Sequence, residues 1–364
     1  MKKYPALTVN HKLLKENMEQ VVSWCAEAGI DIAGVIKVTN GLASVADDYV
    51  QSGAKWIASS RLEHLIRVKE AGIDIPKLMI RIPMISELDK LVEVCEYSLQ
   101  SELSTLKELN KRAQSADKIH KVILMADLGD LREGFIDVED LISTAEYVEK
   151  ELDFVHLAGI GTNLGCYGSV IPTKEKMNQL IEYAEAVEQA IGRKLEIISG
   201  GATTSLIPIF DKEMPGRINM LRIGSAVITG ALEDIRTCYG REEMDALHDD
   251  SITLEAEVVE VKVKPTHPIG KLGVDAFGQT REYIDRGNRK RAILAVGRAD
   301  YGDTGDILPQ IEGVEVIGAS GDHTILDIED CKEDIRPGDI VRFKLKYSAI
   351  LYLTGSENVK IYEI

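Results

Sequence analysis

Short apolar segments alternate with amphipathic segments along the first two thirds of the chain, and this alternation constrains the fold most strongly. Eight of the apolar segments have the length and composition of buried strands: 32–37, 55–58, 77–82, 95–99, 120–126, 154–160, 195–199 and 218–223. The segments between them, such as Leu62 to Ala71 and Lys174 to Ile191, carry apolar residues at the spacing of helices. Eight consecutive strand–helix units predict an α/β fold, a closed parallel (β/α)8 barrel of the TIM type.

The pattern changes after about residue 240, where strand-like segments are separated by Gly, Pro and Asp turns. These segments are 252–263, 291–296, 314–318, 338–345 and 358–363, and they predict a small all-β domain. A chain of 364 residues has room for a barrel of roughly 250 residues and one smaller domain. We therefore expect a barrel domain over 1–240 and a C-terminal β domain over 241–364, which the early strand 6–9 could join.

Charge and cysteine content narrow the class of protein. A net charge of -17 argues against nucleic acid or an anionic membrane surface as the main partner. The five cysteines are scattered and form no C-x-x-C pair, which is typical of reduced cytoplasmic thiols and predicts neither a disulfide framework nor a metal site. The N-terminus lacks the apolar core of a signal peptide, and no apolar stretch reaches the roughly 18 residues of a membrane span. We therefore expect a cytoplasmic protein.

Lys37 closes the first predicted strand and is followed by polar Thr39-Asn40-Gly41. In this place its ammonium would be partly stripped of water, which lowers its pKa and frees the neutral amine. A neutral amine beside a phosphate site is what pyridoxal 5'-phosphate requires for a Schiff base. The same lysine could instead cap the strand and extend into solvent, and this segment alone does not decide between the two interpretations.

Small residues follow the seventh and eighth predicted strands, where phosphate is commonly held in a (β/α)8 barrel. Such residues let backbone N–H groups approach a phosphate closely, although a glycine pair can also be only a turn. The candidates for the phosphate site are Ser199, Gly200, Gly201, Thr203, Gly224 and Ser225.

Three larger polar side chains also lie at the ends of barrel strands. Arg222 closes the eighth strand, Arg132 follows the fifth and Asn163 follows the sixth. At the mouth of one barrel each could face a cofactor ring. Taken singly, each arginine could be a surface cation and Asn163 could cap a loop.

These residues, in this order, resemble the fold-type III pyridoxal-phosphate enzymes of the alanine racemase superfamily, over about Leu7 to Tyr362. The matching segments are 33–41 (AGVIKVTNG), 56–72 (WIASSRLEHLIRVKEAG), 127–134 (DLGDLREG) and 221–230 (LRIGSAVITG). The resemblance implies that Lys37 forms the Schiff base and that Arg222 donates to the pyridine nitrogen. It also implies that Arg132 contacts the phenolic oxygen of the cofactor and the carboxylate of the substrate.

The resemblance further implies a homodimer with shared active sites, because in this family the β domain of one subunit covers the barrel of the other. Two positions depart from the family pattern. Arg298 stands in place of the tyrosine that serves as the second base, and arginine is a poor proton acceptor. Tyr301 and His323 are then the candidates for that base. Gly41 replaces the usual cofactor-binding tyrosine after the lysine.

The segment Ser320-Gly321-Asp322-His323 stands where ornithine decarboxylases of the superfamily carry Cys-Asp-Gly. Asp322 matches the aspartate that holds the distal ammonium of the substrate, whereas Gly321 replaces the cysteine that protonates the decarboxylated carbanion. The implied substrate is a diamino acid and the implied reaction is racemisation. As a whole the chain resembles ornithine racemases, which implies two-base interconversion of L- and D-ornithine or a similar basic amino acid.

Two other classes of protein remain open. One is another enzyme of the superfamily: an alanine racemase, a diamino-acid decarboxylase or a lyase like the metal-dependent D-threonine aldolases, which the loop 199–203 also resembles. The other is a non-catalytic carrier of pyridoxal phosphate. The substantial β domain argues against a carrier, because the single-domain carriers lack it.

Overall fold

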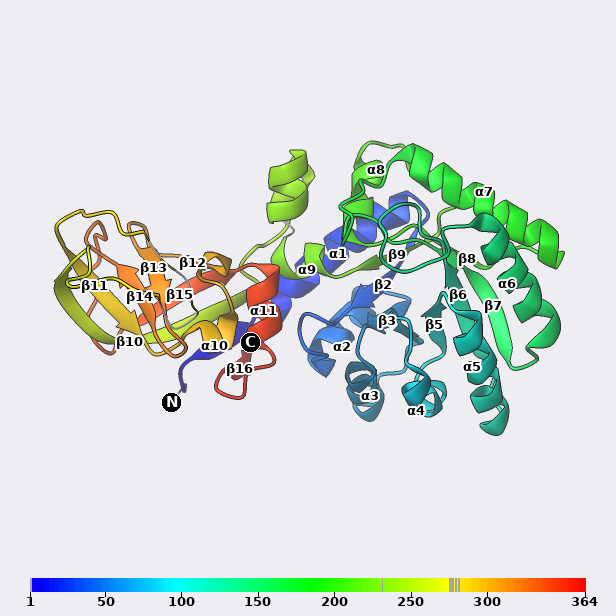
Figure 1. Cartoon of the computed structure of the whole chain (residues 1–364), viewed down its shortest axis with the longest axis horizontal. Helices are drawn as coiled ribbons and strands as arrows, with labels where there is room; N and C mark the ends of the chain where they lie inside the picture. The colour runs from blue at the N-terminus through cyan, green and yellow to red at the C-terminus, as the bar shows by residue number, and fades with distance from the viewer. Residues whose placement is uncertain (1, 231, 275–277, 279, 281) are drawn as a thin grey trace. The chain divides into compact units, whose positions relative to one another are not determined.

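The computed structural model describes residues 2–230, 232–274, 278, 280 and 282–364 (Figure 1). The chain divides into two compact units. The barrel unit comprises residues 14–248, and the β unit comprises the residues up to Leu13 together with 249–364. Among the helices that the structure describes, none is long and apolar enough to cross a membrane.

Eight parallel strands close the barrel in sequence order, which confirms the predicted (β/α)8 fold. They are β2 (Asp31–Val35), β3 (Trp56–Ser59), β4 (Lys77–Met79), β5 (Tyr97–Gln100), β6 (His120–Met125), β7 (Val155–Gly161), β8 (Ile197–Ser199) and β9 (Met220–Ile223). Because all eight run in the same direction, the loops after them gather at one end of the barrel. We call this end the barrel mouth.

Helices follow the strands and lie outside them, as Figure 1 shows for α3, α5, α6 and α7. Their amphipathic spacing explains this: α7 turns Met177, Leu180, Ala184 and Val187 toward the interior. The helices are α1 (His11–Glu27), α2 (Ala43–Gln51), α3 (Leu62–Glu70), α4 (Leu88–Val94), α5 (Leu103–Ser115), α6 (Val138–Glu151), α7 (Lys174–Ile191), α8 (Ile207–Phe210) and α9 (Ser225–Thr229).

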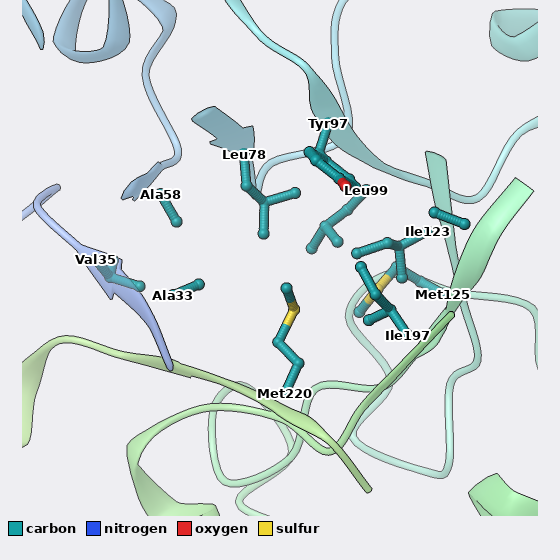
Figure 2. Packing of buried hydrophobic residues seen from close by; sticks show 11 residues of the cluster. Ala33, Val35, Ala58, Leu78, Tyr97, Leu99, Ile123, Met125, Ile197 and Met220 are labelled. Atoms are coloured by element: carbon teal, nitrogen blue, oxygen red, sulfur yellow. The ribbon is translucent and has the colours of Figure 1, made fainter. Parts of the chain in front are cut away.

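The interior of the barrel is filled by side chains from its strands (Figure 2). Small residues lie among larger ones there, with Ala33 and Ala58 near Leu78 and Met220. Because its interior is filled, the barrel is a packed core and not a channel. Ligands of such a barrel bind at the loops of the mouth.

Two barrel strands end two or more residues earlier than the apolar pattern predicts. β2 stops at Val35, because the chain turns there: Thr39 Oγ1 and the Gly41 amide both donate to the Ile36 carbonyl, at 3.1 Å each. β4 stops at Met79, and beyond it the side chain of Arg81 donates to the Ser60 carbonyl at 3.0 Å. Lys37 therefore lies in a turn two residues after its strand, and does not close it.

The β unit is built on one mainly antiparallel sheet, in agreement with the predicted all-β fold. Its strand order is β12-β15-β10-β11-β14-β13, and β1 (Ala6–Val9) pairs with β10 and with β16. The strands are β10 (Ile252–Pro265), β11 (Asn288–Leu294), β12 (Ile307–Pro309), β13 (Glu315–Ala319), β14 (Thr324–Asp327), β15 (Ile340–Leu345) and β16 (Lys360–Glu363). Two short helices, α10 (Arg298–Tyr301) and α11 (Tyr347–Leu353), complete it.

Candidate active site

Lys37 is half-buried in the turn after β2, at the barrel mouth. Burial lowers the pKa of its ammonium, and the cations Arg132 and Arg222 lower it further, whereas Cys166 and Glu133 act in the opposite direction. These electrostatic interactions show that the four side chains lie near Lys37. A lysine whose neutral form is favoured in this way has a more reactive amine than a lysine in water.

Arg222 on β9 is fully buried, and burial lowers the pKa of its guanidinium to about 10. Its terminal nitrogens donate to Ser199 Oγ on β8 and, at 2.8 Å, to the Thr162 carbonyl after β7. No carboxylate lies within ion-pair distance of it in the part of the chain that the structure describes. The charge of Glu133 acts on Arg222 only from beyond ion-pair distance. A buried cation without an ion-pair partner is unfavourable, which makes Arg222 a candidate for contact with a ligand.

Arg132 lies in the loop after β6 and is held on two sides. Its guanidinium donates to both oxygens of Glu133, which raises its pKa, and its third nitrogen donates to Cys166 Sγ at 2.9 Å. The loop keeps its shape because the Asp127 carboxylate accepts the amides of Gly129 and Leu131. Arg132 is therefore fixed at the mouth as a permanent cation.

The loop after β7 is tied to this one by Asp130, whose Oδ1 accepts the amides of Cys166 (3.3 Å) and Val170 (3.2 Å). Asn163 begins the same loop, and its Nδ2 is buried with no hydrogen-bond partner. A buried amide N–H group without an acceptor is unfavourable in a folded protein. An acceptor atom on a ligand could bond to Asn163 Nδ2 and remove this cost.

The candidate phosphate residues lie after β8 and β9. Gly201, with φ of +119°, turns the chain after β8, Ser205 Oγ donates to the Gly200 carbonyl at 2.7 Å, and Thr203 begins a short 3-10 turn. Gly224 is buried beside Val35 of β2, and the half-exposed Ser225 begins α9. These loops offer backbone amides and little side-chain bulk, which suits a phosphate.

The candidates in the β unit differ in exposure. Tyr301 is completely buried, and its hydroxyl is bonded at 2.7 Å to Thr324 Oγ1, which itself donates to the Val296 carbonyl. The Tyr301 hydroxyl is thus the donor of that bond, and burial raises its pKa, so its proton is firmly held. Asp322 and His323 are both exposed in the turn between β13 and β14.

The structure thus brings Lys37, Arg132 and Arg222 together at the barrel mouth, and places Tyr301, Asp322 and His323 in the β unit. Sequence reasoning did not single out Glu133 and Cys166, which act electrostatically on Lys37. Glu133 adjoins Arg132 in the sequence, and this was the one available signal. Nothing in the sequence pairs Cys166 with Arg132, because the contact depends on how two loops pack.

A protein-family model described as "Alanine racemase, N-terminal domain" matches residues 9–231. Two curated relatives align with nearly the whole chain. The lysine racemase of Thermotoga maritima is 38% identical, over 99% of this chain and 99% of its own length. The ornithine racemase of Acetoanaerobium sticklandii is 36% identical, over 98% of this chain and 99% of its own length.

Solved structures agree in fold. The alanine racemase of Streptomyces lavendulae superposes with a TM-score of 0.76 at 16% identity, over 100% of this chain and 98% of the other. The D-threonine aldolase of Filomicrobium marinum gives a TM-score of 0.72 at 15% identity, over 97% of this chain. At these identities the likeness shows a shared architecture and does not distinguish between activities.

Proposed function

The chain belongs to the alanine racemase family and is an amino-acid racemase, and from this premise we propose that it interconverts L- and D-ornithine with pyridoxal phosphate as cofactor. The observation that carries the proposal is the cluster of Lys37, Arg132 and Arg222 at the barrel mouth. Support for a basic substrate comes from the two relatives that align with almost the whole chain, one named for lysine and one for ornithine.

The residues at the mouth fit the cofactor that members of this family use. The fully buried Arg222 has no carboxylate partner among the described residues, and the buried amide of Asn163 lacks an acceptor. Both are explained if a ring with acceptor atoms lies against them. The phosphate would be held by Ser199, Gly200, Gly201, Thr203, Gly224 and Ser225. When bound, pyridoxal phosphate withdraws electrons from the α-carbon of an amino acid and so makes its α-proton acidic.

Lys37 supplies the acid–base group on one face of the substrate. Its lowered pKa increases the share of neutral Nζ at a given pH, and a neutral Nζ can take the α-proton and later return it. Arg132 would hold the substrate carboxylate, since Glu133 and Cys166 fix its guanidinium in place. Arg222 would donate to the ring nitrogen and keep it unprotonated.

The opposite face needs a second acid–base group, and we assign it to His323. An imidazole can both accept and donate a proton, and that of His323 is exposed in its turn. Tyr301 serves this role less well, because its hydroxyl is buried and its proton is committed to Thr324. Asp322, adjacent to His323 on the same turn, would pair with the distal ammonium of the substrate.

A second copy of the chain would bring this turn over the mouth, so the active form is a homodimer. The loops at the mouth carry large apolar side chains that are exposed in the single chain, and such side chains mark an interface. They follow β4, β6 and β7 and are Met84, Ile85, Leu131, Ile136, Tyr167 and Ile171. Size-exclusion chromatography with light scattering should give twice the mass of the chain.

Racemisation of single enantiomers tests the proposed substrate. Purified protein is incubated with L- or D-ornithine, lysine or alanine, and the products are resolved by chiral chromatography. Both enantiomers of ornithine should approach an equal mixture, with kcat/KM above that for lysine and far above that for alanine. Preference for lysine would correct the substrate within the basic amino acids, and preference for alanine would refute the role of Asp322.

The other enzyme classes predict different products. A diamino-acid decarboxylase would release carbon dioxide from ornithine, and a metal-dependent lyase would cleave a β-hydroxy amino acid and lose activity on chelation. Among the described residues there is no group of three or more His, Cys, Asp or Glu side chains placed to hold a metal ion. A non-catalytic carrier would bind pyridoxal phosphate and leave every enantiomer unchanged.

A further inference from the structure

The turn that carries Lys37 is fastened to the next strand through one imidazole. His64 Nε2 lies 3.0 Å from Asn40 Oδ1, three residues after Lys37, and His64 Nδ1 lies 2.9 Å from Ser59 Oγ at the end of β3. Arg67, one turn further along α3, donates to the main-chain carbonyl of the same Asn40. The Lys37 turn is thus joined to β3 and α3 by side-chain hydrogen bonds, in addition to the backbone pairing of β2 with β3.

These bonds determine the protonation state of His64. The Asn40 amide oxygen can only accept, so Nε2 carries a proton and donates it, which leaves Nδ1 to accept from the Ser59 hydroxyl. Burial lowers the pKa of His64 to about 4, and Arg67 and Arg61 lower it while Glu63 opposes them. The ring is therefore neutral at physiological pH and has a fixed tautomer.

The backbone of the Lys37 turn is shaped to fit this ring. Asn40 and Gly41 adopt left-handed conformations, with φ of +49° and +69°, and a turn of this kind needs support from its surroundings. A Cβ atom on Gly41 would lie 2.5 Å from His64 Cβ. The side chain of His64 therefore occupies the space that a larger residue at position 41 would need. Gly41 and His64 are complementary, and Gly41 is where the chain departs from the tyrosine of its family.

We propose that His64 is a positioning residue for Lys37. Through its bond to Asn40, His64 holds the Lys37 turn in its reactive geometry. The inference rests on the proposed function, in which Lys37 binds the cofactor and moves the α-proton. Its role is geometric, since a displacement of about 1 Å at a reacting group can cost roughly a hundredfold in rate. His64 itself touches neither substrate nor cofactor in this account.

A second buried histidine provides the matched control. His120 is fully buried on β6, its Nε2 lies 2.9 Å from Ser98 Oγ, and burial lowers its pKa to about 4 as well. It is the first residue of its strand and so lies at the end of the barrel opposite the mouth. His64→Leu and His120→Leu each remove one buried Ser–His bond, but only the first also removes the bond to Asn40 Oδ1.

Two readouts separate positioning from stability. The first is kcat and KM, and the second is the rate at which pyridoxal phosphate attaches covalently to Lys37 of the cofactor-free protein, followed by visible absorbance. His64→Leu should lower kcat and the attachment rate by about tenfold or more, with KM changed less than about threefold. His120→Leu should keep both rates within about twofold of wild type, although both variants lose thermal stability.

The conservative variant His64→Gln completes the test, because its amide can donate to Asn40 and accept from Ser59. It should restore both rates to within about threefold of wild type. Equal rates in His64→Leu and His120→Leu, or no recovery in His64→Gln, would overturn the inference while leaving the proposed function intact. A wild-type protein that attaches no cofactor at Lys37 would refute the proposed function and this inference with it.

Discussion

Substitution of Arg222 by glutamine removes a buried charge together with the two hydrogen bonds that its terminal nitrogens donate to Ser199 Oγ and the Thr162 carbonyl, because the glutamine side chain is two bonds shorter. The charge is unfavourable where it lies. Since each tenfold change in acidity is worth 1.36 kcal/mol, a pKa lowered from 12.5 to about 10 corresponds to roughly 3 kcal/mol. The variant relieves this cost.

The lost hydrogen bonds work against that gain. A bond donated by a charged group contributes roughly 1.5–3 kcal/mol, so loss of both costs roughly 3–6 kcal/mol and cancels or exceeds the relief. The free energy of unfolding of cofactor-free Arg222→Gln should therefore lie within about 3 kcal/mol of wild type. Racemisation should fall about a hundredfold or more, which is typical when a preorganised donor to a reacting group is removed.

Urea denaturation measures the first quantity and chiral chromatography of ornithine the second. Arg217→Gln is the control, because Arg217 is bonded at 2.6 Å to the buried Glu188 and lies just before β9, at the end of the barrel opposite the mouth. It should lose stability and keep kcat. An Arg222→Gln variant that keeps its activity, or one that unfolds like a protein lacking a structural ion pair, would refute the assignment of Arg222 to a ligand.

Two further predictions concern the carboxylates of Asp322 and Glu188. Asp322→Asn should depress kcat/KM for ornithine by well over tenfold, since loss of one partner of a desolvated charge pair costs roughly 2–5 kcal/mol. The same variant should change racemisation of alanine little. Equal losses on both substrates would indicate that Asp322 only supports its turn. Burial raises the pKa of Glu188, but its bonds to Arg217 and Lys194 outweigh this and lower it to about 2. The stability that Glu188 contributes is thus present above about pH 4.5 and lost as the pH falls toward 2, so Tm should fall less steeply over this range in Arg217→Gln than in wild type.

The sequence predicts the barrel well because its signal is local and repeated. Each barrel strand is a short apolar segment bounded by polar turns, and each long helix buries a stripe at helical spacing, as α7 does from Met177 to Val187. The ends of the strands are predicted less accurately. Apolar content extends the first strand to Lys37, whereas hydrogen bonds within the turn end it at Val35.

The β unit shows where local patterns lose information. The local pattern does not predict β12 (Ile307–Pro309) or β14 (Thr324–Asp327), because strands of three or four residues outside a regular strand–helix repeat carry too few positions for an alternation to be visible. α10 and α11 are equally short helices in strand-like surroundings. Their existence depends on packing within the sheet, which no window of sequence contains.

Part of the candidate site can be predicted from the sequence, and part depends on tertiary packing. Lys37, Arg132 and Arg222 are found from sequence because each follows a strand of one barrel, and parallel strands bring their ends together. The contacts of Cys166 with Arg132, and of His64 with Asn40, join residues that are far apart in the chain. They are set by the packing of loops and become visible only in three dimensions.

Covalent labelling tests whether Lys37 is the lysine that binds pyridoxal phosphate. The purified protein with pyridoxal phosphate is reduced with borohydride and digested, and the peptides are analysed by mass spectrometry. One modified peptide is expected, with the pyridoxyl group on Lys37, and both the label and the visible absorbance should be lost in Lys37→Ala. A label on a different lysine, or racemisation that persists in Lys37→Ala, would refute the assignment of Lys37.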